Sequence, residues 1–263
     1  MSPLPPMPPD FAPARRVLHH AARAAGALAR RHARAHPRWW HVSLRPRPDG
    51  LVGAPLPLEG GHRAYVRLDL RHGVGVLETS RGELTTVSLE DPNFAARLFG
   101  AAEILGLDVP ELEPLEGDPL PDPAAAAAFH LVLEVVDDAM IRHRNGLAGA
   151  VGPIQLWPHG FDVAFEWLGT RTASYLDDGV ATELPTQIAF GFDPADDPYF
   201  YANPWPFDPA LVDEALPAPA RWHTDGWEGT ILPYRELEGR SDGVERLLAY
   251  FRAVFDVAAP GLA

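Results

Sequence analysis

The chain has 263 residues, 46% of them hydrophobic, and no cysteine, which excludes disulfides, thiol nucleophiles and thiolate metal sites. All 22 basic residues are arginine, so Schiff-base lysine chemistry, pyridoxal phosphate attachment and a P-loop lysine are excluded as well. The net charge of −14 is uneven, because residues 1–50 carry nine arginines against only Asp10 and Asp49. An acidic body argues against nucleic-acid binding, and the basic segment is expected to dock on the acidic part of its own chain.

No apolar run approaches the roughly 20 residues that span a bilayer, so we expect no membrane partner. The Pro-rich residues 1–12 lack the hydrophobic region of a signal peptide and are expected to be disordered. Cytoplasmic location follows by elimination.

Apolar residues recur at helical spacing after residue 15, opposite a basic stripe of Arg16, Arg23, Arg30 and Arg34. This pattern predicts an amphipathic helix that ends before Pro37. The alternation of Trp40, Val42 and Leu44 with polar residues then predicts a half-buried strand.

The next segment predicts an antiparallel meander, because its connections are too short for parallel crossovers. Residues 51–58 are rich in proline and are expected at a sheet edge. Alternating strands are predicted at 64–70, 74–79 and 84–89, followed by a helix over 91–105.

An acidic, Pro-rich linker is predicted at 108–123. It separates an N-terminal α+β half (13–107) from a C-terminal α+β half (124–263), which we expect to form one compact body. The second half is predicted to contain a helix at 124–144, strands at 154–157, 161–168, 186–192, 199–202 and 227–232, a loop at 172–185, a Pro-rich excursion at 204–219 and a final helix after Ser241.

Both halves therefore share an order of helix, antiparallel strands and helix. The predicted fold class is α+β, with antiparallel sheets covered by helices and two similar helix–strands–helix halves. The shared order suggests an ancient duplication.

Several segments carry a family resemblance: His36 to Leu44, Gly152-Pro153-Ile154 through Phe161-Asp162-Val163-Ala164, and Gly229-Thr230-Ile231-Leu232-Pro233-Tyr234. Over nearly the whole chain the sequence resembles the bacterial domain of unknown function 5996 family. The resemblance implies a fold and no established activity. The chain departs from the family pattern at Gly26-Ala27, where a Gly-Lys pair is usual, and at Gln155, where a histidine often stands.

Two motifs join bulky rings to an imidazole: Trp39-Trp40-His41-Val42 and Trp157-Pro158-His159-Gly160-Phe161-Asp162. Such clusters mark either a fixed core layer or the wall of a pocket. We predict a small-molecule pocket between the two halves, with Arg171 as an anion contact, lined by Trp40, His41, His159, Asp162, Arg171 and Tyr201. Catalysis is left open; its most plausible form is acid–base or hydrolytic chemistry that uses His41 or His159 with Asp162.

Metal and cofactor sites are not expected. His32 and His36 have helical ligand spacing, but Arg30, Arg31 and Arg34 surround them, and a cationic field opposes the binding of a dication. The sequence contains no phosphate-binding glycine loop of recognised pattern.

The alternative is a non-catalytic interaction protein. The aromatic, Pro-braced segment 199–207 or the Arg-rich first helix would then contact a protein partner. An exposed apolar patch around Trp205 would favour this alternative.

Overall fold

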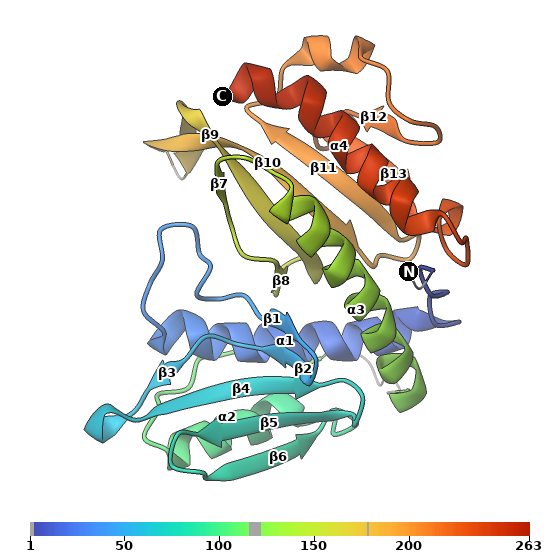
Figure 1. The fold of residues 1–263 in the computed structure, drawn as a ribbon. Helices are drawn as coiled ribbons and strands as arrows, with labels where there is room; N and C mark the ends of the chain where they lie inside the picture. The colour runs from blue at the N-terminus through green and yellow to red at the C-terminus, as the bar shows by residue number, and fades with distance from the viewer. Residues whose placement is uncertain (1–2, 116–121, 178) are drawn as a thin grey trace. The chain divides into compact units, whose positions relative to one another are not determined.

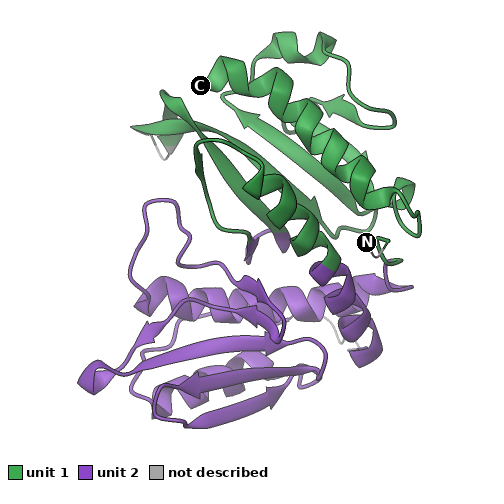
Figure 2. Ribbon diagram, viewed as in Figure 1, with its two compact units in different colours: residues 1–6, 135–154, 163–263 green, residues 7–134, 155–162 purple. Residues whose placement is uncertain are grey.

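The computed structural model describes residues 3–115, 122–177 and 179–263 (Figure 1). The described residues form four α-helices and two antiparallel sheets, so the predicted α+β class is confirmed. Contacts divide the chain into two compact units (Figure 2). Unit 1 comprises residues 1–6, 135–154 and 163–263, and unit 2 comprises residues 7–134 and 155–162.

The compact units do not follow the two continuous halves of the sequence. The chain passes from unit 2 to unit 1 after Glu134, inside a helix, and returns to unit 2 for Gln155–Asp162. The linker predicted at 108–123 lies partly outside the described residues, because 116–121 are not described, and its role as a domain boundary stays a prediction. By element order, each half does contain a helix, an antiparallel sheet and a helix, as the sequence predicts.

Unit 2 is built on a sheet whose strands run in the order β1-β2-β4-β5-β6, with β3 beside β4. Helices α1 and α2 contact each other and this sheet (Figure 1). Its elements are α1 (Phe11–His32), β1 (Arg45–Arg47), β2 (Gly50–Val52), β3 (Leu56–Pro57), a 3-10 turn (Glu59–Gly61), β4 (Arg63–Asp69), β5 (Val74–Thr79), β6 (Leu84–Ser88), α2 (Phe94–Ile104), the first part of α3 (Pro123–Asn145) and β8 (Gln155–Trp157).

Alternation explains the central strands of unit 2. Ala64, Val66 and Leu68 of β4 are buried, whereas the residues between them are partly exposed. Gly75 on β5 leaves room for the ring of Phe94, which would lie 2.5 Å from a β-carbon at that position. The side-chain period of two thus places the apolar face of the sheet against the helices.

Unit 1 is built on a second antiparallel sheet, whose path runs β12-β13-β11-β10-β9-β7. Helix α4 contacts β10 and β11 (Figure 1). The elements are β7 (Ala150–Val151), β9 (Asp162–Asp177), β10 (Val180–Asp193), β11 (Tyr199–Trp205), a 3-10 helix (Pro209–Asp213), β12 (Arg221–His223), β13 (Gly229–Pro233), a second 3-10 helix (Tyr234–Glu236) and α4 (Gly243–Leu262).

Aromatic side chains fill the core of unit 1. Phe165, Phe190 and Phe251 are fully buried and surround the imidazole of His143, whose ring lies 4.6 Å from the ring of Phe190. Burial of this imidazole lowers the pKa of His143 to about 4, so it is neutral at pH 7.

Two local predictions are wrong. The segment Trp40–Leu44 is a series of turns and not a strand, because Trp39 adopts a left-handed backbone and Val42 N donates to Trp39 O over 3.0 Å. The predicted loop at 172–185 is instead the far end of the β9–β10 ladder, in which Leu176 pairs with Ala181. The β-branched residues of this segment favour a strand, and Gly179 with φ 79° supplies its turn.

Disorder is predicted for residues 1–12, of which residues 1 and 2 lie outside the described part of the chain, but residues 4 and 5 make specific contacts. The side chain of Leu4 is fully buried, Tyr234 Oη donates to Pro5 O over 2.6 Å, and Gly239 N donates to Leu4 O over 2.8 Å. Helix α1 already begins at Phe11. Burial of Leu4 and two hydrogen bonds thus hold a segment whose Pro-rich composition predicts disorder.

Among the helices of the described residues, none combines the length and apolar character that crossing a bilayer requires.

Candidate functional site

The two ring-and-imidazole motifs meet inside unit 2. Leu44 N donates to Leu156 O over 3.0 Å, and Leu156 N donates to Leu44 O over 2.7 Å. Beside this pair, the buried hydroxyl of Ser43 lies 2.6 Å from Oε1 of the buried Gln155. The turn before Leu44 and the turn after Leu156 are therefore joined by backbone and side-chain hydrogen bonds.

Helix α1 holds both turns from one side. A β-carbon at Gly26 would lie 2.7 Å from Pro158 Cγ and 3.0 Å from Val42 O, so only glycine allows this close approach. His19 Nε2 donates to Pro158 O over 2.8 Å. The second turn is thus fixed to α1 by packing and by a hydrogen bond.

Each turn contains a bulky residue with a left-handed backbone. Trp39 has φ 59° and Phe161 has φ 63°. Bulky side chains rarely adopt this region, which costs about 1–3 kcal/mol and persists only where the surroundings enforce it. Phe161 is enforced by burial of its ring against Phe129 and His19. Backbone strain of this kind concentrates at functional sites.

A cavity of about 580 Å³ opens beside these turns, and we call it the Trp39 cavity. Its volume lies in the range of small-molecule sites. Two tryptophans, three arginines, one histidine and one acid are among its lining residues, which are Arg23, Gly26, Ala27, Arg30, Arg38, Trp39, Val42, Glu111, Leu112, Trp157, Pro158 and His159.

The ring of Trp39 is the most distinctive part of the cavity wall. It is 52% exposed, although tryptophan is usually well buried. The guanidinium carbon of Arg30 lies 5.3 Å from its ring centroid, and the imidazole of His41 is stacked at 5.6 Å. Within residues 3–115, 122–177 and 179–263, no carboxylate forms an ion pair with Arg23 or Arg30.

Of the six residues predicted to bind a ligand, His159 lines the Trp39 cavity. Trp40 and His41 lie in the same turn as Trp39 but are not among its lining residues. Trp40 stacks on His36 at 4.3 Å, and His41 Nδ1 accepts a hydrogen bond from His36 N over 3.1 Å. These two side chains therefore stabilise the turn through their contacts with His36.

The other three predicted residues lie elsewhere. The carboxylate of Asp162 covers Gly160, where a β-carbon would lie 2.6 Å from Asp162 Oδ1. Arg171 and Tyr201 belong to unit 1. There Arg171 Nη1 donates to Gly261 O over 2.8 Å, and the ring of Tyr201 packs over Gly191. The role of all six residues in ligand binding stays a prediction.

Sequence reasoning missed most of the cavity lining. Arg23 and Arg30 were visible as the basic stripe of α1, which by itself indicates only a solvated or docking face. Trp39 was part of the first motif, but the sequence predicted neither the exposure of its ring nor its left-handed backbone. No local pattern predicts that conformation for a tryptophan.

Two histidines near the turns that border the cavity, His19 and His41, have lowered pKa values. Burial lowers the pKa of His19, and the charges of Arg15 and Arg23 lower it further. Burial also lowers the pKa of His41, with smaller contributions from His36 and Arg30. Because His41 Nδ1 accepts a hydrogen bond, its proton at neutral pH is on Nε2.

An acidic segment, residues 108–115, runs along the arginine face of α1. Arg31 pairs with Asp108 over 3.3 Å, and His32 Nε2 donates to Asp108 O over 2.6 Å. Further along, Glu111 lines the Trp39 cavity together with Arg23 and Arg30. The basic segment therefore docks on acidic residues of its own chain, as the charge distribution predicts.

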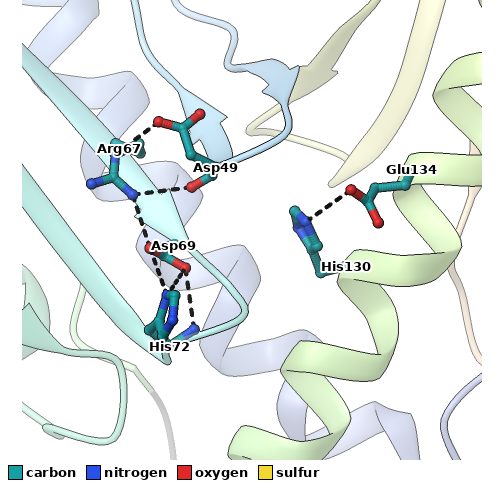
Figure 3. A network of polar contacts seen from close by, with 6 residues as sticks. All are labelled: Asp49, Arg67, Asp69, His72, His130 and Glu134. Carbon is teal, nitrogen blue, oxygen red and sulfur yellow. Dashed lines mark hydrogen bonds and ion pairs between the residues drawn. The ribbon is translucent and has the colours of Figure 1, made fainter.

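A separate set of polar contacts lies in unit 2 (Figure 3). Arg67 pairs with Asp49 over 3.5 Å and with Asp69 over 2.9 Å, and His72 Nδ1 lies 3.0 Å from Asp69. His130 and Glu134 form a further pair at 3.6 Å. In the described part of the chain, no three histidine or acidic residues are grouped to hold a metal ion.

Fold and site together define an α+β protein with a cationic, tryptophan-lined cavity in one of its two units. The chain belongs to the family of unknown function DUF5996, whose model matches residues 4–262, and this confirms the resemblance seen in the sequence. Neither a curated protein nor a solved structure matches the chain.

Proposed function

We propose that this protein binds a small organic anion with a flat aromatic part in the Trp39 cavity. The observation that carries the proposal is the exposed ring of Trp39, with the guanidinium of Arg30 5.3 Å from its centroid, on the wall of a cavity of about 580 Å³. An exposed tryptophan ring leaves apolar surface in contact with water, which is unfavourable, and a flat ligand stacked on the ring would cover that surface.

Charge favours an anion in this cavity. Arg23, Arg30 and Arg38 face a single acid, Glu111, among the lining residues, although the whole chain carries a net charge of −14. Clustered charge of one sign in a cavity concentrates ligands of the opposite sign. A guanidinium also matches the geometry of a carboxylate or phosphate with two parallel hydrogen bonds.

The cavity wall is preorganised for binding. Gly26 allows α1 to contact both turns closely, and the paired hydrogen bonds of Leu44 and Leu156 tie those turns together. Preformed walls lose little conformational entropy when a ligand binds. We propose binding rather than catalysis, because His41 supports the turn and is not part of the cavity lining.

The test is a ligand screen by thermal shift and tryptophan fluorescence. The probes are phenyl phosphate, indole-3-carboxylate and nucleoside 5′-monophosphates, with the uncharged parent compounds as controls. A ligand of the folded state at about 100 times its Kd stabilises the protein by about 2.7 kcal/mol, which raises the Tm.

Variants assign the binding to the cavity. Trp39→Ala is expected to weaken binding by about 5- to 150-fold, since one stacked ring contributes about 1–3 kcal/mol. Arg30→Gln is expected to weaken binding of the anions but not of their uncharged parents. Arg34→Gln is the matched control, because Arg34 carries the same charge just after α1 and is not among the cavity residues. Equal affinity of Trp39→Ala and wild type for every probe would contradict the proposal.

A further inference from the structure

A second cavity of about 400 Å³ adjoins the Trp39 cavity in unit 2, and Arg23 lines both. We call it the Arg16 pocket. Its lining residues are Arg16, His19, His20, Arg23, Glu113, Pro114 and Leu115. Two cationic hollows that share one arginine have room for two anionic groups of a single ligand.

The sequence spacing of the arginines on α1 determines how far apart they lie along the helix. Arg16, Arg23 and Arg30 follow one another at seven-residue steps on α1. Seven residues make nearly two helical turns, so the three side chains share a face and succeed one another at about 10 Å. The Trp39 cavity and the Arg16 pocket therefore lie along one basic stripe.

The acidic segment 108–115 already supplies one carboxylate to each hollow. Glu111 lines the Trp39 cavity, and Glu113 lines the Arg16 pocket. Two residues of chain span at most about 7 Å, so the segment brings two acids of the same chain to adjacent cationic sites. At exposed positions a contact between a carboxylate and an arginine contributes only about 0–1 kcal/mol, so a multiply charged ligand with better geometry can compete with both acids.

We infer that the ligand is a nucleoside diphosphate or a molecule of the same chemistry, which rests on the proposed function of the Trp39 cavity. The flat ring stacks on Trp39. The first phosphate lies at Arg23 and Arg30, and the second enters the Arg16 pocket, where Arg16 and His20 are the residues that contact it. A diphosphate fits better than two separate acids, since its charged groups are adjacent and Arg23 lies between the hollows.

The experiment is calorimetric titration of the full chain with nucleosides, their 5′-monophosphates and their 5′-diphosphates, each with the four common bases. We expect the diphosphate of at least one base to bind about tenfold or more tightly than its monophosphate, the gain of one charge-assisted contact. Because both phosphate contacts are ionic, this gain is expected to shrink as the salt concentration rises.

Substitutions locate the second phosphate. Arg16→Ala is expected to remove the advantage of the diphosphate and to leave monophosphate binding unchanged. Glu113→Gln is expected to raise the affinity for the diphosphate alone, because it removes the competing carboxylate. Arg34→Ala, outside both hollows, is the control for a general loss of positive charge. Arg16, Glu113 and Arg34 are exposed, so these variants are expected to fold.

The outcomes separate this inference from the proposed function. Equal affinities for mono- and diphosphates, or an Arg16→Ala variant that weakens both alike, would overturn the inference while the Trp39 cavity stays the binding site. Trp39-dependent binding of indole-3-carboxylate without any nucleotide would have the same consequence. Binding of none of these probes would overturn the proposed function itself, and the inference with it.

Discussion

Gly26 of α1 offers the sharpest test of how the cavity wall is held. In Gly26→Ala, the new β-carbon would lie 2.7 Å from Pro158 Cγ and 3.0 Å from both Pro158 Cβ and Val42 O. Alanine in a helix interior is about 1 kcal/mol better than glycine. Overpacking against a rigid ring and a carbonyl costs about 1–3 kcal/mol. The net expectation is a free energy of unfolding lower by up to about 2 kcal/mol.

Gly100→Ala is the matched control. Gly100 lies inside α2, and a β-carbon there meets nothing within 4 Å. The same helical preference then acts without a clash, so this variant is expected to be stabilised by about 1 kcal/mol. Urea unfolding of both variants gives the difference, which equals the overpacking cost of about 1–3 kcal/mol. The reasoning about close approach would be refuted if Gly26→Ala gained as much stability as Gly100→Ala.

Three further predictions concern stability. Leu4→Ala should lower the free energy of unfolding by about 2 kcal/mol or more, since Leu4 is fully buried; urea melts equal to wild type would instead agree with a disordered N-terminus. Thr230→Val should cost about 1–3 kcal/mol in the same assay, because the hydroxyl 2.6 Å from the buried Tyr250 Oη is lost, and no cost would mean that this phenol finds another partner. Burial lowers the pKa of His143 from 6.5 in the unfolded chain to about 4 in the folded protein. As the pH falls, the unfolded chain therefore binds this proton first, and the free energy of unfolding decreases between pH 6.5 and pH 4. The decrease amounts to about 3 kcal/mol. In His143→Phe the free energy of unfolding should depend less on pH between 6.5 and 4, and an unchanged pH dependence would refute the lowered pKa of His143.

Much of the fold was predictable because its central strands follow a simple period. Ala64, Val66 and Leu68 alternate in the sequence, and the structure buries these three residues on one face of β4. The amphipathic stripe of α1 was equally visible. In such elements the local pattern and the tertiary packing agree, so the sequence alone predicts both.

The turn at Trp39 was not predictable from periodicity. Trp40, Val42 and Leu44 alternate as in a strand, yet the hydrogen bonds of this turn and the left-handed backbone of Trp39 prevail. The end of this turn is held by Leu156, which pairs with Leu44 and is more than 100 residues away in the chain. Contacts between residues so far apart in the sequence cannot be predicted from the local pattern of polar and apolar residues.

The candidate site was predictable only in part. The motifs that join rings to imidazoles pointed to the turns around Trp39 and His159, and the structure connects these turns through Leu44 and Leu156. The arginines on the cavity wall were read as an ordinary basic helix face, because the acidic segment opposite them is separated from α1 by the whole first sheet in the sequence. Arg171 and Tyr201 lie in unit 1, in contacts of their own.

The excursion of Gln155–Asp162 into unit 2 has a consequence for any attempt to divide the protein. A fragment that stops in α3 would keep Trp39 and the basic helix but would lack Trp157, Pro158 and His159, half of the tryptophan pair on the cavity wall. A fragment that starts in α3 would carry those residues without the helix that holds them. The wall of the Trp39 cavity is therefore encoded in two distant stretches of the sequence, and truncation, fusion or domain exchange at a single site would separate its parts.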